Sequence, residues 1–486
     1  MLPGAALASA PGVAWWQAML FASLAGGLGW GIRGQYGHET GAMIAGLLVS
    51  LVLARLFCPH AEAAAVARAV AWGTIAIGFG GSMTYAQTIG LSHDQPLVGN
   101  WAALRWGMLG LAIKGGIWIG YAGAFLGMGL GGKSYSARGM VLAWLGILGL
   151  VALGIWLINE PFDPAHHVLP RIYFSDDWHW EPGATLKPRR EVWGGMLFGL
   201  IGLLAFVRLK ARDALAFRLG LWAFAGGAVG FPLGQCLQAY HAWNVAYFHS
   251  GAWAGLDPII NWWNFMETTF GLVLGAALGL GLWLNRKAIK VRPRGNVIEI
   301  PAGGEVLLLV LHVGLLVTSE FFGVRWVDRL YDFGMLLGFI PLVAVAGGRW
   351  WPYVLMLPVT ALPILGKTIR LVVYEERSVG PVAGWIGYGL GPLIVVTILA
   401  IRHARAERRS QTAEAFLRPF LLVATWLFFG LNFAFFRFPW PWSPWTYRTP
   451  NGIVFAICSL GLTYCALGRV GKPVAMRLGQ PAAGDQ

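Results

Sequence analysis

Long hydrophobic runs separated by short polar segments form the dominant pattern along this chain. A helix needs about 20 apolar residues to cross roughly 30 Å of hydrocarbon. The apolar runs cover residues 14–34, 40–57, 67–90, 104–130, 139–158, 192–209, 214–238, 260–284, 305–323, 332–347, 350–373, 382–401, 417–436 and 451–468. They are continuous and lack the alternation of membrane β-barrel strands. The pattern predicts an all-α polytopic membrane bundle of about 14 transmembrane helices.

The composition agrees with this pattern. Hydrophobic residues make up 57% of the 486 residues, charged residues 12%, and the mean hydropathy is +0.61. Soluble domains carry about 25% charged residues. No Lys or Arg precedes the first apolar run, and no cleavage pattern interrupts it. We therefore expect residues 14–34 to be a spanning helix and not a signal peptide.

The distribution of charge predicts how the chain is oriented. The net charge is +14, and basic clusters at Arg208–Arg212, Arg286–Arg294 and Arg402–Arg409 each follow an even-numbered apolar run. Loops rich in Lys and Arg stay in the cytoplasm. We predict a multi-pass protein of the cytoplasmic (inner) membrane, with both termini cytoplasmic. Its basic surface would contact anionic lipids on that side and would not bind nucleic acid.

Several apolar runs begin with a related sequence. Glu39-Thr-Gly-Ala-Met resembles Glu191-Val-Trp-Gly-Gly-Met and Asp332-Phe-Gly-Met, and Asn451-Gly-Ile is a weaker copy. An acidic or amide side chain at this position suits the capping and dipole of a helix N-terminus. The copies predict four-helix units in the same orientation. Their boundaries are 1–138, 139–290 with a long outer loop at 159–190, 291–404, and a closing helix pair with cytoplasmic tail at 405–486.

Polar side chains collect at the outer end of the predicted helices. Such residues are costly in hydrocarbon and usually face a cavity or a partner. If the repeats pack around one axis, these residues line one outward-facing, substrate-binding vestibule. The candidates are Arg33, Gln35, Tyr36, His38, Glu39, Gln87, His93, Asp94, Lys114, Gln235, Gln238, Trp262, Asn264, Glu267, Glu320, Asp332, Lys367 and Arg370. The alternative is a set of structural ion pairs, for which Lys114 with Glu267 is a natural candidate.

The outer loops mix tryptophan with polar residues. Asp177–Trp180, Asn261–Asn264 and Phe438–Trp445 suit a sugar, because an indole covers the C–H face of a pyranose while carboxylates and amides bind its hydroxyls. An aromatic belt at the lipid interface is the competing interpretation. The outer histidines, including His38, His93 and His241, match no metal-binding spacing, so we predict neither a metal nor another cofactor. The loop 159–190 is long enough to act as a lid.

Three functions are compatible with these features. The favoured hypothesis is a secondary transporter for a polar, carbohydrate-like solute, with Glu39, Glu267 and Asp332 as binding or coupling carboxylates. The alternative is a membrane-embedded transferase or hydrolase acting at the extracytoplasmic face on a lipid-linked or glycan substrate, with Glu39, His38 or Asp94 as general base. The third is a structural subunit of a homo-oligomer or membrane complex. A tunnel through the protein would favour a transporter. A blind outer site that opens to lipid would favour an enzyme, and a dry core would favour a structural subunit.

The segment before Glu39 separates architecture from function. Residues 33–38, Arg-Gly-Gln-Tyr-Gly-His, precede the first copy of the repeated motif and have no counterpart before the other copies. The shared part of the motif is therefore expected to be architectural. The unshared part is the first place to look for function.

Overall fold

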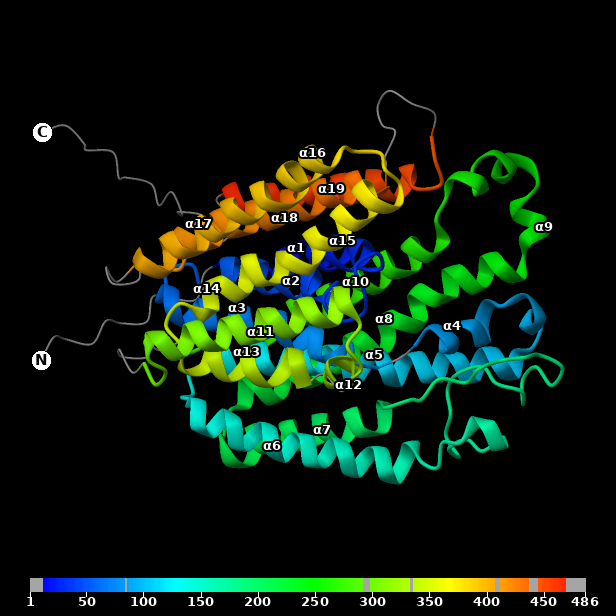
Figure 1. Cartoon of the computed structure of the whole chain (residues 1–486), viewed down its shortest axis with the longest axis horizontal. Helices are drawn as coiled ribbons and strands as arrows, with labels where there is room; N and C mark the ends of the chain where they lie inside the picture. Colours follow the sequence, from blue (N-terminus) through cyan, green and yellow to red (C-terminus); the bar gives the residue numbers. More distant parts are fainter. Residues whose placement is uncertain are drawn as a thin grey trace, which may run out of the picture.

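The fold is a bundle of helices that run roughly along one common axis (Figure 1). The computed structural model describes residues 12–83, 85–291, 298–332, 335–406, 411–436 and 445–468. All regular elements within these residues are helical, which confirms the all-α part of the predicted fold class. The predicted Trp- and Pro-rich segment Phe438–Trp445 lies almost wholly outside the described residues.

The helices vary from one turn to 30 residues. Their bounds are α1 Trp15–Arg33, α2 Ala42–Phe57, α3 Ala63–Gly80, α4 Ala86–His93, α5 Trp101–Leu130, α6 Ala137–Gly154, α7 Trp193–Ala205, α8 Ala214–Trp243, α9 Val245–Phe248, α10 Trp262–Leu284, α11 Ala302–Phe322, α12 Arg325–Asp332, α13 Met335–Gly347, α14 Trp351–Val354, α15 Thr360–Ile369, α16 Pro381–Trp385, α17 Gly391–Ala406, α18 Glu414–Phe436 and α19 Thr449–Leu467. Single π-helical turns extend α6, α7 and α15, and join α14 to α15 and α16 to α17.

The helices identify a membrane-embedded protein. Among the described residues, 11 helical segments are long and apolar enough to cross a membrane. The predicted runs 14–34, 40–57 and 332–347 coincide with α1, α2 and α13, which are not among the 11. Since α2 and the apolar part of α13 are shorter than 18 residues, the total of fourteen spans stays a prediction.

The two ends of the bundle differ. At one end, Trp283 donates to the carbonyl of Val13 (2.9 Å) and Arg55 donates to the carbonyl of Gly468 (3.3 Å), so the described ends of the chain lie together. We call this the termini end. The opposite end carries the loop 159–190, and α4, α8 and α9 extend there, while residues 34–41 face this end from nearer the middle of the long axis (Figure 1). We call it the loop end.

Six helices form a closed ring in the order α1, α2, α3, α5, α8 and α10, with α10 returning to α1. Glycine allows the backbones to meet closely. A Cβ on Gly26 of α1 would lie 2.1 Å from the carbonyl oxygen of Gly271 on α10, and one on Gly115 of α5 would lie 2.5 Å from that of Gly227 on α8. Small residues give membrane helices this kind of contact in place of a hydrophobic driving force.

Aromatic side chains close the interior of the ring. Trp30 packs against Trp118 and Phe270, with ring centroids 5.0 and 4.5 Å apart, and Phe231 stacks on Phe270 at 4.5 Å. All four side chains are completely buried. We call these four residues the aromatic plug. They close the ring immediately to the termini side of Arg33.

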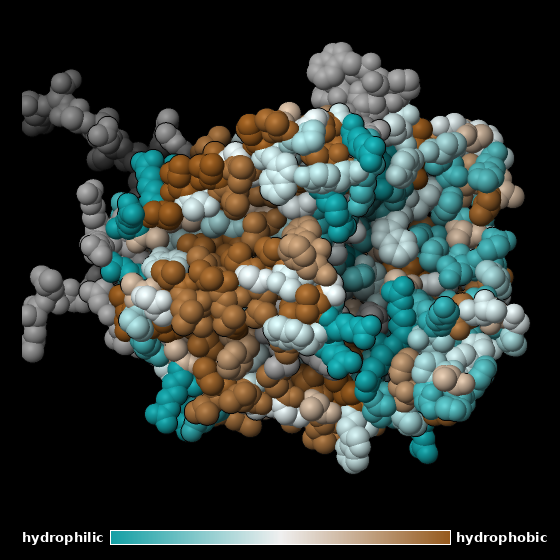
Figure 2. Space-filling view, in the orientation of Figure 1, coloured by the Kyte–Doolittle hydropathy of each residue, from teal (hydrophilic) through white to brown (hydrophobic). Residues whose placement is uncertain are grey.

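The remaining helices surround the ring and face lipid. The hairpin of α6 and α7 lies against α5 and α13, while α18 and α19 cover α2 and α1. Large apolar side chains on α6, α11, α17 and α19 are exposed, as expected for a lipid-facing surface. Figure 2 shows this apolar surface between a thin hydrophilic rim at the termini end and a broad hydrophilic region at the loop end.

The packing of the helices bears on the predicted four-helix repeat and on the predicted run 67–90. The four-helix repeat stays a prediction, because α1 and α2 belong to the ring whereas α6 and α7, their predicted counterparts, pack outside it. The predicted single run 67–90 is wrong in detail, because α3 ends at Gly80 and α4 begins at Ala86. Gly81 lies against the backbone of residues 38 and 39, where a Cβ would come within 2.5 Å of the His38 carbonyl oxygen.

Candidate functional site

The connection between α1 and α2 lies at the centre of the loop end. Residues 34–41 leave α1 at Arg33 through a turn in which the Tyr36 amide donates to the Arg33 carbonyl (2.8 Å). Gly37 has a φ of +93°, a conformation that glycine adopts without strain. We call residues 33–41 and the side chains they contact on α10, α11, α12, α15 and the start of α19 the 34–41 site.

Arg33 is the first charged group of this site. Its guanidinium donates to Glu267 Oε1 of α10 (2.9 Å) and to the Tyr85 hydroxyl. It also lies 4.8 Å from the ring centroid of Trp30 and 5.3 Å from that of Trp118. Both charged side chains are at most 1% exposed. Aromatic faces stabilise such a desolvated cation.

This ion pair retains unused hydrogen-bonding capacity. Glu267 Oε1 also accepts from the Trp263 indole (3.1 Å), whereas Glu267 Oε2 and Arg33 Nε are buried and form no hydrogen bond of normal geometry among the described residues, although Asn264 and Arg448 lie near the carboxylate. Buried polar atoms are nearly always paired, so each such atom calls for an explanation. Three residues before Glu267, Asn264 accepts from Arg448 at the start of α19 (2.8 Å).

A second charged group lies on the other side of the loop. Lys367 of α15 pairs with Glu320 of α11 (2.6 Å) and donates to the Tyr36 carbonyl (2.7 Å). Glu320 Oε1 accepts from the hydroxyls of Thr40 and Tyr331, both at 2.9 Å. Three distant parts of the chain therefore meet at the residues that follow Arg33.

His38 and Glu39 lie between these two charged groups and retain partial solvent access. Burial, with Arg33, Arg189 and Lys367 nearby, lowers the pKa of His38 to about 3, so its ring is neutral at physiological pH. Burial and the neighbouring Glu320 raise the pKa of Glu39 to about 8. Glu39 is therefore mostly a protonated acid near neutrality, close to the Tyr331 hydroxyl.

In a second cluster at the loop end, every charged side-chain atom has at least one hydrogen-bond partner. Lys114 of α5 pairs with Glu191 before α7 (2.6 Å) and donates to the Thr88 hydroxyl (2.7 Å). Glu191 also accepts from the Ser175 hydroxyl (2.9 Å) and the Phe174 amide (3.0 Å). The predicted pairing of Lys114 with Glu267 is wrong, because α8 lies between α5 and α10 in the ring and each charged residue has a nearer partner.

The expected acidic helix caps are also wrong. Neither α2 nor α7 has a side-chain cap at its N-cap residue, Gly41 or Val192. The side-chain oxygen of Asn159 instead accepts from the amides of Gly194 and Gly195, at 3.0 and 3.3 Å. The carboxylates of Glu39 and Glu191 are directed to tertiary contacts, so the similarity between the two motifs does not reflect a shared capping role.

A third group of predicted residues lies where α4 meets α8. Gln235 donates to the Ser92 hydroxyl (2.7 Å), and its Oε1 and that of Gln238 are buried without a partner among the described residues. His93 Nδ1 lies 3.5 Å from Asp94 Oδ1. Gln87 contacts the backbone of residues 187 and 189, which anchors the loop 159–190 across α4.

Two predicted residues, Trp262 and Arg370, lie elsewhere. The Trp262 indole donates to Asp257 (2.7 Å) in the segment between α9 and α10 and stacks on His241. Arg370 is exposed and pairs with Glu375 (3.2 Å). The side chain of Asp332 lies outside the described residues. Arg33, Gln35, Tyr36, His38, Glu39, Asn264, Glu267, Glu320 and Lys367 meet in the 34–41 site.

Sequence reasoning missed four members of the site, Thr40, Tyr85, Tyr331 and Arg448. Tyr85 follows the glycine-rich break after α3, which was predicted as uninterrupted helix. Arg448 follows the Trp- and Pro-rich segment, which was predicted to bind a sugar through its tryptophans. The available signal for Arg448 was its position just before an apolar run, whereas Tyr85 lies inside the predicted run 67–90 and hydrophobicity gave no signal for it.

The fold and the site define a class: a polytopic α-helical membrane protein with a buried polar site at one end of a closed helical ring. Comparison with known proteins finds no family model that matches the chain, and no significant match to a curated protein or a solved structure.

Proposed function

We propose that this protein is a membrane-embedded enzyme that acts at the extracytoplasmic face on a lipid-linked polar substrate, with Glu39 as its general acid. The orientation follows from the basic clusters at the termini end, which positive-inside topology assigns to the cytoplasm. The 34–41 site then lies at the outer edge of the membrane. This interpretation replaces transport as the favoured hypothesis.

The observation that carries the proposal is a lipid-facing apolar groove beside the site. A cavity of about 390 Å³ between α11, α15 and α17 is lined by Phe321 and Gly366, the sequence neighbours of Glu320 and Lys367. Glu320 and Lys367, the sequence neighbours of these lining residues, also lie near the Glu39 carboxyl. A lipid chain in the groove would place its polar head at the ion pair, so substrate could enter from the membrane.

The aromatic plug supports an enzyme over a carrier. Trp30, Trp118, Phe231 and Phe270 are completely buried across the interior of the ring, immediately behind Arg33 and Glu267. A substrate at the site therefore faces a closed floor. A blind outer site with lateral access from lipid is the arrangement expected of an enzyme that works on membrane-anchored substrates.

Glu39 suits acid catalysis at neutral pH. A general acid works best when its pKa lies near the working pH, because it is then largely protonated and still gives up its proton readily. The pKa of Glu39 is about 8. Glu39 would donate its proton to the leaving oxygen as the bond to that oxygen breaks. An acceptor hydroxyl or water forms the new bond and returns a proton to Glu39. Arg33 and Lys367 would hold the anionic part of the substrate.

The test uses purified protein in detergent with lipids extracted from bacterial inner membranes, followed by mass spectrometry of the lipid-linked species. We expect wild type to convert a lipid-linked species, Glu39→Gln to lower the rate about 100-fold or more, and Glu160→Gln to have no effect. Glu160 is a partly exposed carboxylate at the same end and lies outside the groove. Activity should fall as pH rises through about 8, because the protonated acid is the active form. Wild-type activity retained by Glu39→Gln would refute the role of Glu39.

A secondary transporter is the second candidate, favoured by the break between α3 and α4 beside Tyr85 and His38. Many transporters bind substrate where a helix is interrupted. A transporter would leave the extracted lipids unchanged in detergent. It would instead accumulate solute in sealed proteoliposomes in response to a pH gradient, and that outcome would overturn the enzyme proposal.

A further inference from the structure

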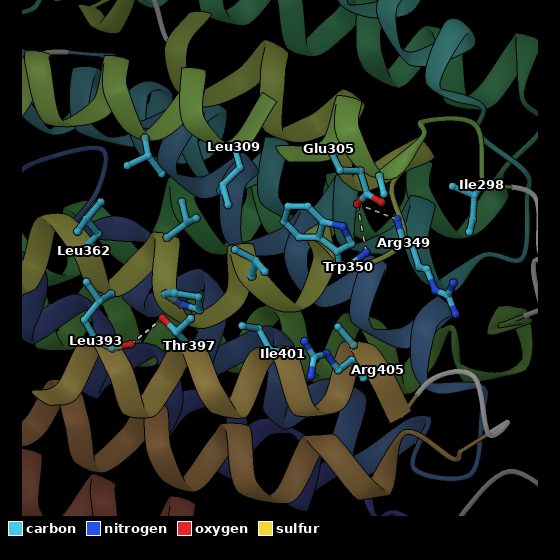
Figure 3. Close-up of a pocket in the computed structure, with 16 residues that line it drawn as sticks. Ile298, Glu305, Leu309, Arg349, Trp350, Leu362, Leu393, Thr397, Ile401 and Arg405 are labelled. Carbon is cyan, nitrogen blue, oxygen red and sulfur yellow. Dashed lines mark hydrogen bonds between the residues drawn. The ribbon is translucent and has the colours of Figure 1, made fainter. Parts of the chain in front are cut away.

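A second, larger groove opens toward lipid at the termini end of the same helices. Its volume is about 840 Å³, and it lies between α11, the segment from Trp350 to Leu362, and α17 (Figure 3). Leu362 and Leu393 are the only residues it shares with the smaller groove near the 34–41 site, among the residues given for the two cavities. The two grooves therefore follow one another along α17.

The walls of the larger groove have the chemistry and length of a lipid chain. The lining is almost entirely apolar away from the mouth, with Leu309, Val313, Val354, Pro358, Val359, Leu362, Leu393 and Ile401 facing it. The stretch of α17 from Leu393 to Arg405 measures about 18 Å at 1.5 Å per residue. This length is slightly more than half of a hydrocarbon layer of roughly 30 Å. The groove therefore spans one leaflet.

The mouth of the groove is basic. Arg349 and Arg405 lie at its termini end with Trp350 (Figure 3). In the part of the chain that the structure describes, neither arginine forms an ion pair with an acidic side chain. Nearby, Arg68 donates to the carbonyl of Gly348 (3.3 Å) and adds to the positive charge.

The one acidic side chain of the groove has a separate task. Glu305 is 1% exposed, and its Oε2 accepts from the backbone amides of residues 349, 350 and 351 at 2.9, 3.2 and 3.3 Å. These bonds fix the turn that carries Arg349. The Glu305 carboxylate therefore holds the mouth in place and lies near the positive charge of Arg349, although the two side chains form no ion pair in the described residues.

We propose that this groove binds one anionic glycerophospholipid, with its phosphate at the basic mouth that Arg349 and Arg405 form and one acyl chain along α17. Arginine binds phosphate through charge-assisted, bidentate hydrogen bonds. Trp350 lies at the depth of the headgroups, where indoles are favoured. The lipid belongs to the leaflet at the termini end. This assignment is independent of the proposed enzyme activity at the opposite end.

The headgroup test uses delipidated full-length protein and native mass spectrometry with phosphatidylglycerol or phosphatidylcholine. We expect wild type to retain phosphatidylglycerol about tenfold better than phosphatidylcholine. The variant Arg349→Gln/Arg405→Gln should lose this preference, whereas Arg138→Gln should keep it, because Arg138 is an exposed arginine at the same end but outside the groove. An undiminished preference in the double variant would overturn the proposal, as would equal retention of the two lipids by wild type.

The chain test uses neighbouring residues of α17. Thr397 lines the groove, whereas Ile398 is 61% exposed on the outer surface of the same helix. Thr397→Trp should fill the groove and abolish retention of phosphatidylglycerol, while Ile398→Trp should leave it unchanged. Retention by both variants would mean that the acyl chain lies elsewhere and would refute the site. The arginine variants decide the question if Thr397→Trp does not fold.

Discussion

Two ion pairs at the loop end are equally buried but differ in how many of their charged atoms have hydrogen-bond partners. Arg33 with Glu267 and Lys114 with Glu191 each join two distant helical segments, and all four side chains are at most 1% exposed. Lys114 and Glu191 are surrounded by donors and acceptors that complete their hydrogen bonding. The pair of Arg33 and Glu267 leaves Arg33 Nε and Glu267 Oε2 without described partners.

This difference separates a structural pair from a site. A completed network fixes the loop 159–190 against α4 and α5 and has no capacity left for a substrate. An incomplete network stays costly until another group completes it. The residues beside the incomplete pair, His38 and Glu39, are also the ones with partial solvent access. Of the two clusters, the 34–41 site therefore combines polar atoms that lack a partner with access to solvent.

The largest effect is expected from Glu191→Gln. The change leaves the Lys114 ammonium buried without its counter-charge and places an amide donor near the Ser175 hydroxyl or the Phe174 amide. Removing one partner of a buried pair costs about 3–5 kcal/mol. The measurement is the free energy of unfolding in mixed micelles by SDS titration.

The matched control for this variant is Glu160→Gln. Glu160 pairs with Arg190 at the same end, and both side chains are partly exposed. Exposed pairs contribute about 0–1 kcal/mol, so the control should unfold nearly as wild type does. Equal losses in Glu191→Gln and Glu160→Gln would contradict the structural role of Glu191.

A smaller loss of stability is expected from Glu267→Gln. Arg33 keeps its contacts with Trp30, Trp118 and the Tyr85 hydroxyl, and the aromatic faces continue to stabilise the cation. We expect destabilisation of about 1–2 kcal/mol in the same titration, together with loss of the activity measured for the proposed function. A loss of stability as large as that of Glu191→Gln, with activity retained, would make the Arg33 pair structural as well.

The helices and the polar segment of these clusters were predictable from the sequence, but the ion-pair partners were not. Long apolar runs predicted the helices because burial in lipid imposes a length that is visible in the chain. The segment 33–38 was recognisable as a site because it places many polar groups between two apolar runs. The partners of the charges were not predictable. Lys114 can meet Glu191 or Glu267 depending on the order of helices in the ring, and a linear pattern does not contain that order.

Breaks in helices were the second source of error. Residues 67–90 are nearly all apolar or small, so hydrophobicity alone predicted one span. At Gly81, directly after the end of α3, the backbone of residues 38 and 39 occupies the space that a side chain would need, so this position requires glycine. That constraint comes from the 34–41 loop itself. Local sequence therefore could not reveal Tyr85 as a partner of Arg33.

The smallest effect concerns Asp176, the one carboxylate near Glu191 whose hydrogen bonding is incomplete. Asp176 and Asp94 both face Gly90, and Asp176 Oδ1 is buried without a described partner. Burial, followed by the charges of Asp94, Glu181 and Asp177, raises the pKa of Asp176 to about 6. The native state therefore holds this proton more tightly than the unfolded chain does.

The sign of the pH effect follows from that raised pKa. The stabilising contribution of protonated Asp176 is fully present below the ordinary pKa of 3.8 and is lost as pH rises through about 6. Between pH 4 and pH 7 the melting temperature of wild type should fall, relative to Asp176→Asn, by on the order of 1–2 °C. Glu375→Gln, an exposed carboxylate change, should leave the wild-type slope intact. If Asp176→Asn keeps the wild-type slope, the incomplete bonding of Asp176 has no energetic consequence, and unsatisfied atoms at the 34–41 site become weaker grounds for calling it functional.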